Sequence, residues 1–390
     1  MLAAINRFVP DAQTFDRREW DALKPTRRID GRLLADVGFW NLLLGAVGIE
    51  AYSFVRDALG YSNTVANWNA IEAMQDLVAD FVGDIRYRTL RDGLQAIPLT
   101  MTERFAAADG QLALGHHLRR LDRTVRDGEP LMTLRFDVSP EARPLTIQAR
   151  HVVLALPRRA IELLDPESFL FGHDQFVAVL GAVSPQPGAK LFLGYDHPWW
   201  TDLGLRRGRS VTDLPLRQVY LGVEGEQPGA DTANRSALLL ASYTDGPTVQ
   251  FWSEYLPSSP PSVPGAAAQP ARPADVTAPA AMIAEAQRQL REVHGPAARI
   301  PEPSFTSCQD WGRDPFGGAF HFWEVGAKSW EVIPRMRRPI PDANLSICGE
   351  AWSTGQGWIV GALNTAERML EERFGLRRPA WLPEDSYLSV

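Results

Sequence analysis

The sequence of residues 344–373 is NLSICGEAWSTGQGWIVGALNTAERMLEER, and its pattern predicts a strand, a polar turn and a helix. Leu345, Ile347 and Cys348 form a short apolar run that is typical of a strand covered on both faces. The segment STGQG has turn composition, and from Trp358 onward apolar residues recur at helical spacing. A helix N-terminus presents free N–H groups and a partial positive charge, so this unit favours an anionic ligand. An ordinary strand-to-helix connection has the same local pattern.

The chain has 390 residues, 45% of them hydrophobic, which is enough for a sizeable core and about two or three domains. Its formal net charge of −7 argues against nucleic acid as a partner. No apolar run approaches the ~18 residues of a membrane helix, and the N-terminus lacks a signal layout, so we expect a cytoplasmic protein without membrane contact. Cys308 and Cys348 are too few for a disulfide framework and lack metal-ligand spacing, so no metal site is predicted.

Helical and strand-like patterns alternate along the rest of the chain. Residues 1–30 are polar and irregular, and residues 31–92 are mainly helical with a break near Gly45 or Gly48. Prolines concentrate in residues 257–280, which predicts a solvated, extended insertion. The pattern also predicts strands at 84–88, 112–121, 131–138, 151–157, 176–183, 189–195, 218–222, 237–243 and 305–311, and helices at 99–108 and 282–293.

The segment GEAWSTGQGWIVGALNTAERM, residues 349–369, resembles the C-terminal flavin-binding segment of the flavin-containing monoamine oxidase and L-amino acid oxidase family. The resemblance covers about residues 35–375. It is also carried by HVVLALPRRAIELL at 151–164, GAKLFLGYDHPWW at 188–200, GRSVTDLPLRQVY at 208–220, LLLASYTDG at 238–246 and DPFGGAFHFW at 314–323.

This resemblance implies an α/β and α+β fold. It consists of an incomplete FAD-binding (glutathione-reductase-like) domain, a mixed-sheet substrate domain and a helical subdomain. The expected division is an N-terminal arm and helical substrate subdomain at 1–92, portions of the FAD-binding domain at 93–165 and 331–376, a substrate-binding sheet domain at 166–330, and a tail at 377–390.

Lys190 is the first candidate for chemistry, because it lies in an apolar strand and an unpaired buried ammonium is costly. The resemblance gives it the role of holding a water against flavin N5, where hydride arrives and dioxygen later reacts. An outward lysine on an exposed strand face is the alternative. The resemblance further implies that Tyr243 holds the substrate carboxylate and that the Gly357 carbonyl accepts from the amine. Phe320 and Trp358 would form the two walls of a substrate cage, although both could be core aromatics.

The resemblance also implies the cofactor contacts. Gly349 and Glu350 would lie near the FAD diphosphate and ribityl chain, the Ile359 N–H would face the flavin pyrimidine edge, and Trp358 would stand over the flavin ring. The backbone at Leu118 would meet the adenine. Some members carry a cysteine at the position of Ala319 that bonds to FAD, so the FAD is expected to be non-covalent here.

The four histidines His116, His117, His151 and His321 show no geometry for a nucleophile or a metal. We expect each of them to be a solvent or core histidine.

The sequence contains no G-x-G-x-x-G turn and no acidic residue ending a second strand, the features of a dinucleotide-binding βαβ unit. Three explanations stay open: a small subunit supplies the unit, the natural chain starts earlier, or the chain is a degenerate fragment. We favour the first two jointly, so a partner subunit carrying the βαβ unit is expected.

The activity implied by the resemblance is oxidative deamination of an L-amino acid to a 2-oxo acid, ammonia and hydrogen peroxide, with FAD as cofactor and dioxygen as oxidant. The family's carboxylate-binding arginine cannot be identified in this sequence. A primary or polyamine oxidase and an amino acid monooxygenase therefore stay open, and a non-catalytic scaffold subunit is the alternative outside enzymes.

Overall fold

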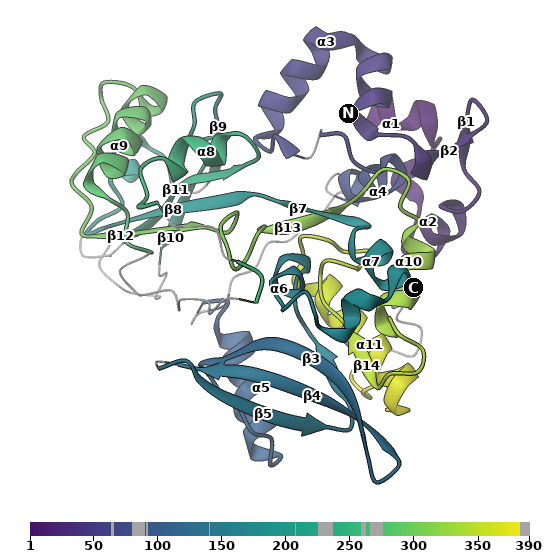
Figure 1. Ribbon diagram of the computed structural model, residues 1–390. Coiled ribbons are helices and arrows are strands. Elements are labelled where there is room, and N and C mark those ends of the chain that lie inside the picture. Colours follow the sequence, from purple (N-terminus) through teal and green to yellow (C-terminus); the bar gives the residue numbers. More distant parts are fainter. Residues whose placement is uncertain are drawn as a thin grey trace.

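The computed structural model describes residues 1–63, 66–79, 90, 93–139, 141–206, 208–224, 237–258, 263–265 and 276–382. These residues form a mixed arrangement of helices and sheets (Figure 1). N-terminal helices lie on one side, a five-stranded sheet on the other, and a three-stranded sheet lies below them near the C-terminal helix. The strand predicted at 84–88 and most of the proline-rich insertion at 257–280 fall outside the described residues.

The N-terminal region is helical and includes two short helices that its sequence did not predict. Its helices are α1 (Leu2–Phe8), α2 (Arg17–Leu23), α3 (Phe39–Leu59) and α4 (Ala70–Ala79). The prediction that residues 1–30 are irregular is therefore wrong. Asp16 and Glu19 form a capping box in which each side chain accepts from the other's backbone N–H, and this box starts α2. Ile5 and Trp20 are buried in the core of this region, so tertiary packing stabilises helices too short to persist alone.

Helix α3 is interrupted at Gly48, where φ is 77° and ψ is 168°. This confirms the predicted break, because glycine adopts a positive φ without the steric cost of a Cβ. The second half of α3 ends at Gly60, close to the five-stranded sheet. A Cβ added to Gly60 would lie 2.7 Å from Cγ of Gln218. This close approach brings the end of α3 against the sheet.

The five-stranded sheet has the order β12-β8-β11-β10-β9, and all its pairs are antiparallel. Its strands are β8 (Gly188–Tyr195), β9 (Gly208–Val211), β10 (Gln218–Glu224), β11 (Ala237–Asp245) and β12 (Phe305–Asp310), which confirms the strands predicted at 189–195, 218–222, 237–243 and 305–311. Helices α8 (Thr248–Ser253) and α9 (Ala280–His294) lie beside it (Figure 1), and α9 confirms the helix predicted at 282–293. Trp252 and Met282 join Trp199 and Trp200 in the buried core of this region.

Residues 176–183 correct another prediction, because most of this segment is helical. Helix α7 (Asp174–Leu180) precedes the short strand β7 (Val183–Gln186), which pairs with β13 (Phe320–Trp323). A short apolar run is compatible with a buried strand or a buried helix. Phe176, Val179 and Leu180 are the buried residues of α7, and their spacing of three and four positions is that of one helix face.

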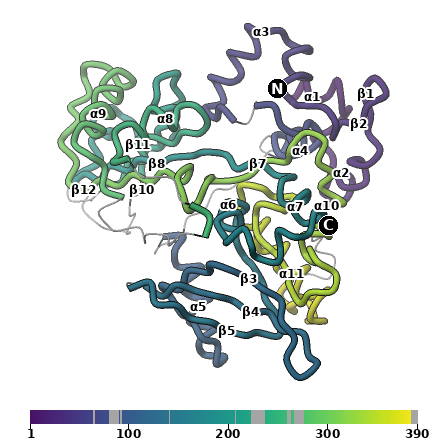
Figure 2. The backbone as a smooth tube through the Cα atoms, in the orientation of Figure 1, coloured from purple at the N-terminus to yellow at the C-terminus, as the bar shows by residue number. Residues whose placement is uncertain are grey.

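The C-terminal unit has the predicted strand, turn and helix. Strand β14 (Leu345–Ile347) pairs in parallel with β6 (Val152–Leu154), and helix α11 (Ile359–Phe374) follows the turn. Among the described residues, β6 and β14 form a sheet of two strands. Helix α10 (Ser329–Arg337) packs against both α7 and β14, and its Arg337 pairs with Glu372 of α11 at 2.8 Å. The backbone of this region can be followed in Figure 2.

The three-stranded sheet consists of β3 (His116–Arg126), β4 (Glu129–Val138) and β5 (Arg143–Ala149), and α5 (Ala96–Ala107) confirms the predicted helix before it. The remaining short elements are β1 (Arg28–Ile29), β2 (Arg32–Leu33) and α6 (Arg158–Glu162). In the described part of the chain, no helix has the length and apolar character needed to cross a membrane.

Candidate active site

Lys190 and Tyr243 face each other across strands β8 and β11. The register pairs the two residues directly. Lys190 Nζ lies 4.5 Å from the centroid of the Tyr243 ring and 5.8 Å from that of Trp311, which allows a cation–π contact. Burial lowers the pKa of the Lys190 ammonium, because the charged form loses hydration there. Lys190 is thus half-buried rather than outward-facing. Its strand brings it to Tyr243, which the resemblance assigns to the substrate carboxylate.

Two further tyrosines adjoin Tyr243. The Tyr61 ring meets the Tyr243 ring edge to face at 5.4 Å, and the Tyr220 ring lies 6.4 Å from it. The Tyr61 and Tyr220 hydroxyls are 3.5 Å apart, and the Tyr220 hydroxyl donates to Gln218 Oε1 at 2.9 Å. Burial raises the pKa of both Tyr61 and Tyr243, so both phenols stay neutral at physiological pH.

Sequence reasoning missed Tyr61 and Tyr220. Tyr220 ends the segment 208–220 that carries the resemblance, so it could have been selected from its position there. Tyr61 follows the glycine at the end of α3, and no local pattern indicates that it meets a strand far along the chain.

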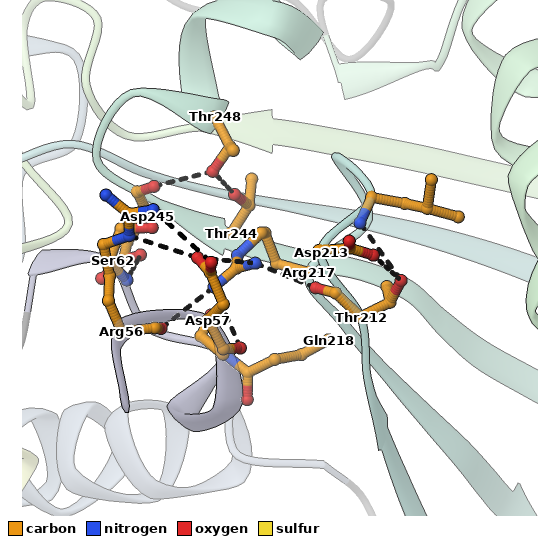
Figure 3. A network of polar contacts seen from close by, with 12 residues as sticks. Arg56, Asp57, Ser62, Thr212, Asp213, Arg217, Gln218, Thr244, Asp245 and Thr248 are labelled. Carbon is orange, nitrogen blue, oxygen red and sulfur yellow. Dashed lines mark hydrogen bonds and ion pairs between the residues drawn. The ribbon is translucent and has the colours of Figure 1, made fainter. Parts of the chain in front are cut away.

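A polar network joins Ser62, the residue after Tyr61, to Asp245 of the sheet (Figure 3). The Asp245 carboxylate accepts from the backbone N–H groups of Ser62 at 2.7 Å and Asn63 at 3.1 Å. Burial raises the pKa of Asp245 to about 6, although these N–H groups and nearby Arg217 oppose the shift.

Arg217 holds the same junction from the α3 side. Its guanidinium is 3% exposed and donates to the carbonyls of Arg56 at 3.2 Å and Asp57 at 3.3 Å, near the C-terminus of α3. A cation there complements the negative end of the helix dipole. It also donates to the Thr212 carbonyl at 2.9 Å, so one side chain joins helix and sheet (Figure 3).

Phe320 and Gly357 lie together, and they belong to the two segments that the resemblance assigns to the walls of a substrate cage. A Cβ on Gly357, where φ is 80°, would lie 3.7 Å from the Phe320 Cβ. A Cβ on Gly188, at the start of β8, would lie 2.7 Å from the Ala319 Cβ. The strand of Lys190 therefore begins beside the Phe320 wall. Trp358, which follows Gly357, is 56% exposed and is not a core aromatic.

Glu350 has a histidine partner that sequence reasoning missed. His321 Nδ1 lies 2.8 Å from Glu350 Oε2, and the His321 backbone N–H donates to Oε1 at 3.0 Å. The Gly357 N–H donates to the same Oε1 at 2.5 Å. His321 is 2% exposed, so it is a core histidine as expected, but its carboxylate partner is a three-dimensional feature.

The start of α11 is the region that the resemblance assigns to the flavin. No side chain caps the N-terminus of α11, where Ile359 is 54% exposed, so this end of the helix is open to an electronegative group. Gly349, at φ 148°, donates to Thr365 Oγ1 at 3.0 Å, which fixes the strand-to-turn junction. Ala319 has no thiol, so it offers no atom for a covalent bond to the flavin.

Leu118 lies on β3 opposite Phe136, and its side chain packs against the interior core that contains Leu121. Its predicted backbone contact with adenine stays a prediction. No group of three or more His, Cys, Asp or Glu residues suited to a metal ion occurs among the described residues.

Three comparisons place these observations among known proteins. Residues 49–369 match the model of the family described as flavin containing amine oxidoreductase. Aplysianin-A of Aplysia kurodai is 27% identical over 372 residues, which cover 91% of this chain and 64% of that protein. L-amino-acid oxidase 4 of Hebeloma cylindrosporum is 25% identical over 257 residues, which cover 60% of this chain and 36% of that protein. The chain thus spans less than two thirds of these relatives.

The fold is shared with a solved structure of wild-type putrescine oxidase bound to putrescine. The TM-score is 0.63 at 18% sequence identity, and the match covers 96% of this chain and 76% of the other. An identity this low supports a common fold and nothing finer.

Proposed function

Because the chain belongs to the flavin containing amine oxidoreductase family, whose cofactor is FAD, we propose that it oxidises an L-amino acid with dioxygen. The products are a 2-oxo acid, ammonia and hydrogen peroxide, and water is consumed. The observation that carries the proposal is the direct pairing of Lys190 with Tyr243 on strands β8 and β11. The first of these strands starts beside the segment of Phe320.

Each side chain has a stated task in this proposal. FAD, bound non-covalently, would supply the hydride acceptor for substrate oxidation and the electrons for reduction of dioxygen. Phe320 and Trp358 flank the substrate, and the Gly357 carbonyl accepts from its amine. The neutral Tyr243 hydroxyl donates to the carboxylate. Lys190, whose pKa is lowered by burial, holds a water or dioxygen near the reacting atoms.

All the proposed cofactor contacts except that of Leu118 belong to the C-terminal unit. The uncapped N-terminus of α11 at Ile359 would hold the pyrimidine edge of the flavin and would stabilise negative charge there. Gly349 and Glu350 would hold the diphosphate and ribityl chain, and Leu118 the adenine.

The L-amino acid is favoured because several relatives are named L-amino-acid oxidases, among them that of Hebeloma cylindrosporum. The competing substrate is a primary amine or polyamine, which has no carboxylate for Tyr243 to bind. Tyr243→Phe separates the two classes. It raises KM for an amino acid and leaves KM for a plain amine near the parent value.

We further propose that polypeptide outside these 390 residues, in the form of a small subunit, completes the cofactor site. Support comes from exposed apolar residues around the two-stranded β6–β14 sheet: Val153 is 39% exposed, Val360 44% and Leu363 46%. Such residues suit contact with another apolar surface. A dinucleotide-binding βαβ unit would supply strands for the sheet and glycines for the diphosphate.

The test is to purify the chain alone and after co-expression with the product of a neighbouring gene, and to record oxidised-flavin absorption. Absorption only after co-expression, with peroxide formed from L-amino acids and oxo-acid products by mass spectrometry, supports the proposal. Amide products would instead indicate a monooxygenase. Flavin bound by the chain alone removes the need for a partner. No flavin in any preparation, including one of a longer natural chain, favours a scaffold or a fragment.

A further inference from the structure

One carboxylate accepts hydrogen bonds from both segments that carry the aromatic walls. Glu350 Oε1 accepts from the His321 N–H at 3.0 Å and from the Gly357 N–H at 2.5 Å. His321 directly follows Phe320 on β13, and Gly357 directly precedes Trp358 at the start of α11. The two walls belong to different elements, and this shared oxygen atom joins them.

The surroundings make this contact strong. Hydrogen bonds to a carboxylate are about twice as strong as those between neutral groups. The Glu350 side chain is 22% exposed and the His321 side chain 2%, so water competes weakly for the acceptor. Oε2 is held from the other side by His321 Nδ1 at 2.8 Å, which fixes the rotation of the carboxylate. The positive φ of Gly357 lets its N–H point back toward Glu350.

We propose that Glu350 is a positioning residue that sets the gap between the Phe320 and Trp358 rings, through its hydrogen bonds to the backbone of His321 and Gly357. The inference rests on the proposed function, because the gap matters only if a substrate enters it. Misplacement of binding groups by about 1 Å lowers rates on the order of 100-fold in other enzymes, so a fixed gap bears on both affinity and selectivity. A carboxylate has roughly four acceptor positions, so a ribityl hydroxyl could still bind Oε2.

Amide hydrogen exchange tests the contact without substrate or cofactor. In Glu350→Ala, peptides covering 318–323 and 353–360 should exchange faster than in the parent, and both should change together because one acceptor serves both. Glu350→Gln should stay near the parent. Its amide oxygen can accept both N–H groups while its NH₂ donates to the other tautomer of His321. Glu367→Ala on α11 is the matched control. Unchanged exchange of both peptides in Glu350→Ala would overturn the inference.

The flavin-loaded holoenzyme, with any partner it requires, then separates positioning from cofactor contact. At saturating FAD, Glu350→Ala should raise KM for a bulky apolar amino acid roughly tenfold and for a small one less. The dissociation constant for FAD should change less. If the dissociation constant for FAD rises while KM stays at the parent value, Glu350 acts on the cofactor alone. If the parent oxidises no amine, the proposed function fails, while the exchange result still decides whether Glu350 joins the walls.

His321→Phe provides a second variant if Glu350→Ala does not fold. It removes the ring contact to Oε2 and keeps both backbone donors to Oε1. Protection of 353–360 should therefore stay near the parent value. A marked loss of protection in His321→Phe would show that ring packing, rather than the shared carboxylate oxygen, holds the walls.

Discussion

The two ends of the candidate site differ in how far the chain completes them. At the sheet end, Lys190 and Tyr61 each pack on Tyr243. Asp245 and Arg217 are buried there with hydrogen-bond partners. At the proposed flavin end, the start of α11 is uncapped, and Ile359, Val360 and Leu363 are exposed. The sheet end is a packed interior. The exposed apolar residues at the α11 end are typical of a surface that another molecule covers.

This difference separates the requirements for positioning a substrate from those for binding the cofactor. The groups proposed to position a substrate are held by contacts within the 390 residues, because the register of β8 and β11 pairs Lys190 with Tyr243. Groups that meet a large anionic cofactor need facing surface as well as an open helix end. The comparison therefore predicts that changes at the flavin end alter cofactor and partner binding, whereas changes at the sheet end alter chemistry or stability.

The largest effect is expected from Leu363→Asp, on the exposed face of α11. A charge there should prevent docking of an apolar partner surface, and flavin should no longer be retained after co-expression. The unfolding midpoint of the chain alone should barely change, because Leu363 is 46% exposed.

The same change at the sheet end is the control for that variant. Leu239→Asp, at a fully buried position of β11, should unfold the chain outright. Retained flavin in Leu363→Asp, or a large loss of stability in the isolated chain, would contradict the proposed difference between the two ends.

Lys190→Met should give the next largest effect, because it removes the amine and keeps the apolar stem. We expect the oxygen-dependent half of the reaction to slow on the order of 100-fold, while affinity for FAD changes little. Rapid-mixing measurements with oxygenated buffer give the rate, and flavin titration gives the affinity. Equal reoxidation rates in variant and parent would eliminate this role for Lys190.

Local chemistry explains which parts of the fold could be predicted from the sequence. The break at Gly48 and the turn before Ile359 were predictable, because glycine and turn residues act through their own backbone. The apolar run at 176–183 has no such signal, and its helix is decided by what it packs against. The capping box of Asp16 and Glu19 has a local signature, so α2 could have been found.

The candidate site was predictable only as separate pieces. Lys190 and Tyr243 were each selected by resemblance, but their direct pairing depends on strand register. Tyr61 reaches them because α3 ends against the sheet, a tertiary event with no local signature. The contact of His321 with Glu350 likewise depends on how β13 meets the turn after β14. The roles of these residues and the domain boundaries stay predictions.

The smallest expected effect concerns the pH dependence of stability at the sheet end. Burial raises the pKa of Asp245 to about 6 in the folded chain, against about 3.9 for an unperturbed aspartate. The folded state therefore binds more protons than the unfolded state between these values. This contribution to the unfolding free energy is fully present below about pH 4 and is lost as pH rises through about 6, by up to about 3 kcal/mol.

Asp245→Asn should flatten the fall of the unfolding midpoint between about pH 4 and 7, by a few degrees, because the amide does not titrate. Asp213→Asn, at an exposed position of the same network (Figure 3), should follow the parent curve. Parallel curves for parent and Asp245→Asn would mean that Asp245 binds no extra proton on folding. Its charge would then be stabilised by Arg217 and the Ser62 and Asn63 N–H groups. In either outcome flavin retention should not change, because this network lies at the end of the site that the chain completes by itself.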